Sequence, residues 1–231
     1  MESARWLGRS IVASASALLV VATITLAVGE ALPFFESGLA PSAKFAAIVD
    51  RNMRPGKSLM SQRMVLEDCF VALYSLVDRI SPDRRRGDLR SRCLAIADQI
   101  ISSNKANAFA YVVRAKVLAG SGDAGAFSAA LSDARRHAPS EGWLAQMRFE
   151  WAERHRELLT EEGLAAADLD MALLAQTEAG PLSIARHYVE NPAARSRITA
   201  VLETLPAKAQ EKVVAALRDV ARSAAKPDVD E

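Results

Sequence analysis

Histidine and cysteine are the residues best suited to chemistry in this 231-residue chain, which contains three histidines and two cysteines. His137, His155 and His187 are candidates for metal binding or acid–base catalysis, and both roles need a partner side chain nearby. None has a second histidine or a cysteine three or four positions away, the spacing that places two ligands on one helix face. Each lies among charged or polar residues, which favours a surface position. The sequence therefore predicts no metal site.

Nucleophile and carboxylate patterns are also missing from the sequence. No serine lies in a Gly-x-Ser-x-Gly turn, and neither cysteine lies in a known nucleophile motif. The nearest carboxylate pair on one helix is Glu150 and Glu153. Their spacing to Arg154 and Arg156 suits ion pairs on a solvated helix face better than acid–base catalysis. We therefore expect no catalytic residue, no cofactor and no enzyme activity.

Arg84, Arg85 and Arg86 form the densest basic cluster of the chain. A planar guanidinium group binds phosphate, sulfate or uronate well, so the cluster is a candidate anion or partner site. The alternative is a solvated loop whose charge is balanced by nearby aspartates.

Trp143 and Trp151 are eight positions apart on one predicted helix and should lie on roughly the same face. Packing inside the core is one interpretation. The other is an anchor pocket for a partner protein on the concave side of a helical array.

The elements that carry these side chains are predicted to be helices. Alanine is abundant, aromatic residues make up 6% of the chain, and β-branched alternation is nearly absent outside the N-terminal region. Glycine and proline turns separate helices predicted over 107–118, 124–137 and 207–222, with Asp123, Ser140 and Thr160 among the expected caps and starts. The 29 basic and 28 acidic residues are balanced, which argues against nucleic acid as a partner.

One stretch near the N-terminus, Ser10–Gly29, has no charged residue and lies between Arg9 and Glu30. Twenty helical residues rise roughly 30 Å, about the thickness of a bilayer's hydrocarbon core. The stretch therefore predicts one membrane-spanning helix. Small residues separated by three others, such as Ala13 and Ala17, would allow two such helices to pair in a homo-oligomer. A span rich in alanine and serine also produces this spacing by chance.

The flanking charges predict the orientation of this span. Arg5 and Arg9 precede it and Glu30 follows it, so the N-terminus should be cytoplasmic. Alanine- and arginine-rich usage suggests a bacterium, hence an inner-membrane protein with a periplasmic C-terminal domain. The expected segments are a tail over 1–9, an anchor over 10–29, a juxtamembrane linker over 30–57 with room for a short helix at 43–52, a helical-repeat domain over 58–225 and a disordered end over 226–231. The alternative is a secretory signal cleaved near Gly29.

A shift of about 34 residues aligns successive predicted helices, the period of a helix-pair repeat. Within residues 107–139, Tyr111 takes the first aromatic position of such a repeat and Ala115 the small position of its first helix. Further matches are Leu118, Gly122, Asp123, Leu131, Ala134 and the closing Pro139. The segment thus resembles a tetratricopeptide repeat. Arg114 departs from a leucine-like position and Phe127 from the usual alanine.

The resemblance implies an all-α fold in which antiparallel helix pairs stack as a tetratricopeptide-like array, preceded by the transmembrane helix, and it implies a protein-binding scaffold. It covers one unit well, half of the preceding unit fairly, and residues after Trp143 poorly. The spacing alone implies only a right-handed array of helix pairs.

On this repeat alignment, Cys93 takes the small position of a second helix that packs closest to the first, and Cys69 lies on the apolar stripe of the preceding helix. Antiparallel helices bring such positions within about 4–7 Å, the range that a disulfide bridges. We expect a Cys69–Cys93 disulfide in an oxidising periplasm. The alternative is two buried thiols that act as small apolar residues.

These expectations combine into an adaptor or scaffold that binds another envelope protein, in the context of polysaccharide assembly or export. The alternatives are an assembly factor for cell division or cytochrome maturation, and an enzyme with an unrecognised site. A cleft with clustered polar side chains would favour an enzyme, and a smooth apolar groove would favour a binding protein.

Overall fold

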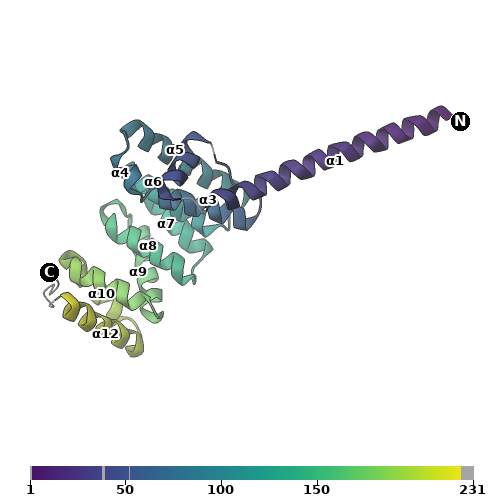
Figure 1. Cartoon of the computed structure of the whole chain (residues 1–231). Helices are drawn as coiled ribbons and strands as arrows, with labels where there is room; N and C mark the ends of the chain where they lie inside the picture. Colours follow the sequence, from purple (N-terminus) through teal and green to yellow (C-terminus); the bar gives the residue numbers. More distant parts are fainter. Residues whose placement is uncertain (1, 38–39, 52, 225–231) are drawn as a thin grey trace. The chain divides into compact units, whose positions relative to one another are not determined.

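The computed structural model describes residues 2–37, 40–51 and 53–224, and every regular element within them is helical (Figure 1). This confirms the predicted all-α class. The chain divides into two compact units, one up to Ile100 and the other from Ile101 onward. The end predicted to be disordered, 226–231, lies outside the described residues.

The first unit is built on a long N-terminal helix and four shorter segments. Its elements are α1 (Glu2–Ser37), α2 (Pro41–Asp50), α3 (Leu59–Ala72), α4 (Leu76–Ile80) and most of α5 (Asp83–Ser103). Helix α3 packs against both α1 and α2, and α4 packs against α2. Phe45, Leu66 and Leu89 are fully buried in the core of this unit.

Helix α1 exceeds the predicted anchor at its C-terminal end. Figure 1 shows α1 as one continuous helix. It extends past Gly29 and Pro33 to Ser37, into the segment 30–57 that was expected to be a linker. Its end is held in place because the Glu30 carboxylate accepts hydrogen bonds from the backbone before α3, and because Pro33 is buried. Helix α2 covers most of the short helix expected at 43–52 and begins and ends two residues earlier.

Residues 14–28 of α1 are exposed on every face, although most of them are apolar. The core helix of a soluble protein would bury such side chains. By length and composition, α1 has one segment, Ser14–Glu36, that is able to cross a membrane.

The apolar residues from Leu59 to Ile80 have helical spacing, but the structure divides this stretch into two helices at Ser75. The Ser75 hydroxyl donates to the carbonyl of Ala72 at 2.7 Å and accepts from the backbone N–H of Asp78 at 3.1 Å. One serine therefore closes α3 and caps α4, a use of its short hydroxyl that competes with helix continuation.

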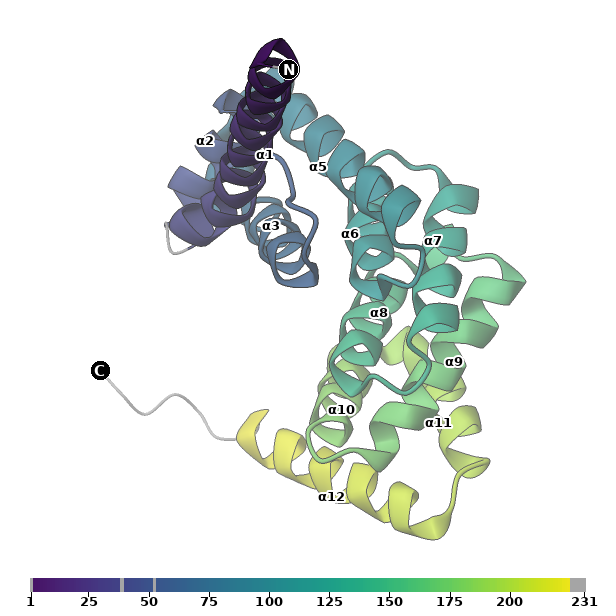
Figure 2. The same ribbon diagram turned by 90° about the vertical axis from the view of Figure 1, so that its right-hand side faces the viewer.

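The second unit consists of helices joined by short turns. Its elements are α6 (Ala108–Ala119), α7 (Ala124–His137), α8 (Gly142–Arg154), η1 (Arg156–Leu158), α9 (Glu161–Gln176), α10 (Gly180–Glu190), η2 (Pro192–Ala194), α11 (Arg195–Glu203) and α12 (Ala207–Ala224). Helix α6 packs on α7, α8 on α9, and α10 on α12 (Figure 2). In addition α8 contacts both α6 and α10, and α9 contacts both α7 and α12.

The predicted helix starts in this unit are mostly confirmed by side-chain caps. Asp123 accepts from the backbone N–H of Ala126 at 3.0 Å, and Thr160 accepts from that of Gly163 at 3.3 Å. The cap predicted at Ser140 is wrong, because α8 begins at Gly142 and Glu141 precedes it without a side-chain cap bond.

The turn between α9 and α10 leaves no space for a side chain at Gly180. A Cβ atom there would lie 2.3 Å from the carbonyl oxygen of Leu174, which is backbone and cannot swing away. We expect Gly180→Ala to lower the free energy of unfolding of this unit by about 1–3 kcal/mol. Urea unfolding followed by the fluorescence of Trp143 and Trp151 measures the loss.

Gly125→Ala is the matched control in the same unit. Its Cβ would meet nothing closer than a side-chain oxygen of Asp123 at 3.8 Å. Since alanine favours helix over glycine, Gly125→Ala should leave stability unchanged or raise it by up to about 1 kcal/mol. Equal losses in both variants would contradict the steric argument.

Candidate functional site

An open groove of about 980 Å³ lies in the second unit, between α8 and α10. We call it the α8/α10 groove; its lining includes Trp143, Gln146 and Glu153 from α8, and Leu182, Ser183, Arg186 and His187 from α10. The turn at Thr177–Gly180 closes one side. The groove therefore depends on the packing of α10 beside α8.

Two large apolar side chains are exposed in the α8/α10 groove. Trp143 is 42% exposed and Leu182 is 41% exposed. The Trp143 ring packs edge-on against Phe109 of α6, with ring centroids 5.4 Å apart. This contact orients the indole while leaving much of its surface open. Exposed aromatic and aliphatic side chains of this kind are the anchors that protein partners commonly bury.

A polar link joins the two helices across the groove. The Gln146 side-chain amide donates to Glu150 at 2.7 Å and to the hydroxyl of Ser183 at 2.5 Å. Because Ser183 belongs to α10, this amide fixes the spacing of the two walls. Both basic and acidic side chains lie along the lining, so the groove has no dominant charge.

An ionic network lies beneath the α8/α10 groove. The buried carboxylate of Glu153 pairs with Arg197 of α11 and lies 2.9 Å from Nε2 of His187. Arg197 also pairs with Asp168 of α9. Burial lowers the pKa of both His187 and Arg197. The network thus ties four helices of the unit together at this point.

The placement of Glu153 corrects the expectation of a solvated helix face. It is buried and pairs with Arg197, which lies on another helix, whereas Glu150 bonds to Gln146. Sequence spacing cannot reveal this partner, because Arg197 lies more than forty positions away and only the fold brings it near.

The histidines differ from one another in exposure. His137 is exposed and stacks on Tyr111, with centroids 5.2 Å apart. His155 and His187 are partly buried, against the surface positions predicted for them. His155 stacks on Trp151, and His187 packs edge-on against Phe149 at 5.8 Å. Aromatic neighbours, which sequence position alone does not indicate, therefore shield both rings.

Trp143 and Trp151 do not share a face. Eight helical positions leave an offset of roughly 80°, which is enough to separate a groove from a core. Trp151 is buried, with the charged groups of Lys116 and Arg154 over its ring, and it does not line the α8/α10 groove. Of the two tryptophans, only Trp143 lines this groove, and its role as a partner anchor stays a prediction.

The arginine cluster begins α5 instead of forming a loop. Arg85 donates to Asp50 of α2 at 2.9 and 3.1 Å and lies over the ring of Phe45. Arg86 pairs with Asp83, and Arg84 is exposed. Two of the three guanidinium groups are thus engaged within the first unit. The anion-binding interpretation stays a prediction.

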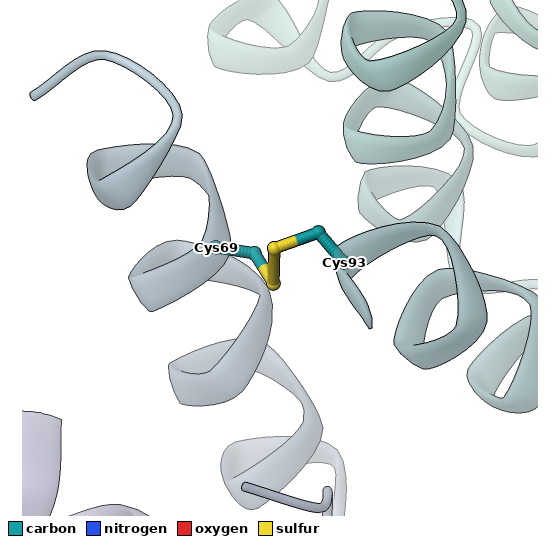
Figure 3. Close-up of a disulfide and its surroundings, with 2 residues drawn as sticks. All are labelled: Cys69 and Cys93. Carbon is teal, nitrogen blue, oxygen red and sulfur yellow. A yellow bond between two sulfur atoms is a disulfide. The ribbon is translucent and has the colours of Figure 1, made fainter. Parts of the chain in front are cut away.

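Cys69 of α3 and Cys93 of α5 lie at disulfide distance, with Cα atoms 5.7 Å apart (Figure 3). Both residues are fully buried. The structure therefore places the pair as the sequence predicted. Oxidation of the pair in the native compartment stays a prediction.

No group of three potential metal-binding side chains comes together within the described residues. Comparison with protein-family models, with curated proteins and with solved structures finds no match for this chain. The tetratricopeptide resemblance consequently stays a prediction.

Proposed function

We propose that the protein is a membrane-anchored adaptor of the bacterial envelope, which holds another envelope protein through the α8/α10 groove. The observation that supports this most directly is that two large, partly exposed apolar side chains, Trp143 and Leu182, line the same open groove of a helical unit. Polysaccharide assembly or export is the context we place first. The alternative is an assembly factor for cell division or cytochrome maturation.

The proposed location is the inner membrane, with the N-terminus in the cytoplasm and the residues after the spanning helix in the periplasm. The exposed apolar surface of residues 14–28 supports a spanning helix. Arg5 and Arg9 before the span, and acidic residues after it, support this orientation. The buried, paired cysteines suit an oxidising compartment.

We also propose that the second unit is a tetratricopeptide-like stack. Its support is the order of contacts, in which the first helices α6, α8 and α10 are neighbours and the second helices α7, α9 and α12 are neighbours. Stacked pairs of this type bury apolar faces that one pair cannot cover. The α8/α10 groove would then lie between the first helices of two successive pairs.

A photocrosslinking amino acid at position 143 or 182 of the full-length protein tests the adaptor in cells. We expect both positions to crosslink to the same envelope protein. Leu169 on α9 is the control, because it is exposed and does not line the groove. Trp143→Ala should then weaken binding of the purified, identified partner by roughly 30-fold, the effect of losing an aromatic hot spot. Crosslinks that are equal at all three positions, or absent at both groove positions, would contradict the proposal.

A second candidate function is acid–base catalysis, which the 2.9 Å approach of His187 to Glu153 in the groove lining favours. The same carboxylate also pairs with Arg197, so the network accounts for both groups as structural links. A cellular phenotype separates the two functions. An adaptor should lose its function in the cell in Trp143→Ala. It should keep that function in a stably folded variant with alanine at His137, His155 and His187, whereas an enzyme should show the reverse.

A further inference from the structure

The exposed apolar surface of α1 ends beside the backbone that precedes α3. The Glu30 carboxylate accepts hydrogen bonds from the backbone N–H of Lys57, from that of Ser58 at 3.1 Å, and from the Ser58 hydroxyl at 2.6 Å. Ser58 is also the N-cap of α3, since its hydroxyl accepts from the backbone N–H of Ser61. One carboxylate thus fastens the start of α3 to α1.

The direction of the Glu30 side chain determines beside which part of α1 the helix α3 begins. Helical side chains lean toward the N-terminus of their helix, so the Glu30 carboxylate lies beside the turn that precedes it, the last turn of the apolar stretch. The approach is close, because a Cβ atom on Gly56 would lie 2.6 Å from this carboxylate. Residues 56–58 therefore lie alongside the end of the stretch at residues 14–28.

The first two residues of α3 are apolar and largely exposed. Leu59 is 67% exposed and Met60 is 56% exposed, and the preceding Lys57 is also exposed. An isolated exposed leucine is ordinary on a protein surface. Here, however, the pair directly follows Lys57 and Ser58, which are bonded to Glu30 just after the exposed apolar stretch of α1. Apolar side chains bordered by a basic residue are typical of segments that lie in a membrane interface.

We propose that residues Lys57–Met60 form a second membrane contact, in which Leu59 and Met60 enter the phospholipid interface of the leaflet where α1 emerges. Lys57 then lies near the lipid phosphates, which its flexible side chain reaches readily. The proposal rests on the proposed membrane anchor. It assigns the phospholipid surface, and not a protein, as the partner of the start of α3.

Depth-dependent fluorescence quenching in phospholipid nanodiscs tests this contact on the full-length chain. A bimane label is placed on Leu59→Cys or Met60→Cys, and the lipids carry bromine atoms on their acyl chains. Val21→Cys, within the exposed stretch of α1, is the positive control. Ile80→Cys is the matched control in the same unit, because it is exposed and lies on α4, which packs on α2. Mass analysis without reductant checks that Cys69 and Cys93 remain paired.

We expect quenching at positions 59 and 60 that approaches the quenching at position 21, and none at position 80. Quenching at position 21 but not at 59 or 60 overturns the second contact and leaves the anchor intact. The absence of quenching at all four positions overturns the anchor and with it this contact. Equal quenching at all four positions, including 80, overturns the specific placement of α3.

Discussion

Replacing Arg148 with methionine is expected to lower the free energy of unfolding of the second unit by about 3–5 kcal/mol, the cost of breaking a buried ion pair. Arg148 is only 1% exposed and donates two hydrogen bonds to Asp170, at 2.7 and 2.8 Å. It also donates to the carbonyl of Ala138 at 3.3 Å, just after α7. The substitution would leave the buried Asp170 with Arg135 as its remaining cationic partner.

Urea unfolding, followed by the fluorescence of the two tryptophans in that unit, measures this loss. Arg136→Met is the matched control, because Arg136 is largely exposed and pairs with Asp133 on its own helix. Such surface pairs contribute roughly 0–1 kcal/mol. In Arg148→Met/Asp170→Leu, part of the lost stability should return, since the Asp170 carboxylate is no longer buried without its Arg148 partner. Equal losses in Arg148→Met and Arg136→Met would show that burial of the pair is unimportant.

Removal of the Cys69–Cys93 link is expected to destabilise the first unit by about 3 kcal/mol. The bond closes a loop between residues 24 positions apart, and the chain-entropy estimate for such a loop gives this value. Against a typical total of about 5–15 kcal/mol, the loss is large. Cys69→Ala/Cys93→Ala should therefore show faster amide hydrogen exchange in α3 and α5, measured by mass spectrometry on the full-length protein.

The oxidation state itself has a direct test. Protein taken from its native compartment should be two hydrogens lighter than the dithiol form, and no thiol should react with a label after unfolding without reductant. Free labelling of both cysteines would mean a reduced pair. In that case the periplasmic location would lose one of its supports. The double alanine variant should then not show the loss of about 3 kcal/mol that is attributed to loop closure.

Much of the fold follows from local sequence signals. Asp123 and Thr160 placed two helix starts where the structure has them. These features act over a few residues, so sequence reading finds them. The apolar spacing did not predict the break at Ser75, because the hydroxyl bonds of this serine interrupt an apolar stripe that otherwise continues.

The buried charges were harder to find, although one of them left a signal. In α8 the buried positions Leu144, Ala145, Phe149 and Ala152 have helical spacing, and Arg148 falls within that stripe. A charged residue on the buried face needs a partner, which periodicity alone does not name. Asp170 is that partner, and it comes from a different helix.

The candidate groove was only half predictable. Trp143 was recognisable as a candidate anchor, because large aromatic residues are often either core or contact residues. The other wall, from Leu182 to His187, carries no motif. Its part in the groove depends on α10 packing beside α8, which is a tertiary contact between segments about forty positions apart.

The unbroken course of α1 has a mechanical consequence. A linker over residues 30–57 that was flexible throughout would let the residues after it move roughly 30 Å from the end of the anchor. A helix that runs from the proposed anchor to Ser37, with Glu30 bonded to the N-cap of α3, prevents that motion. The rest of the first unit is then held at a fixed distance from the membrane. Any tilt or rotation of the proposed anchor would rotate that part of the unit together with it.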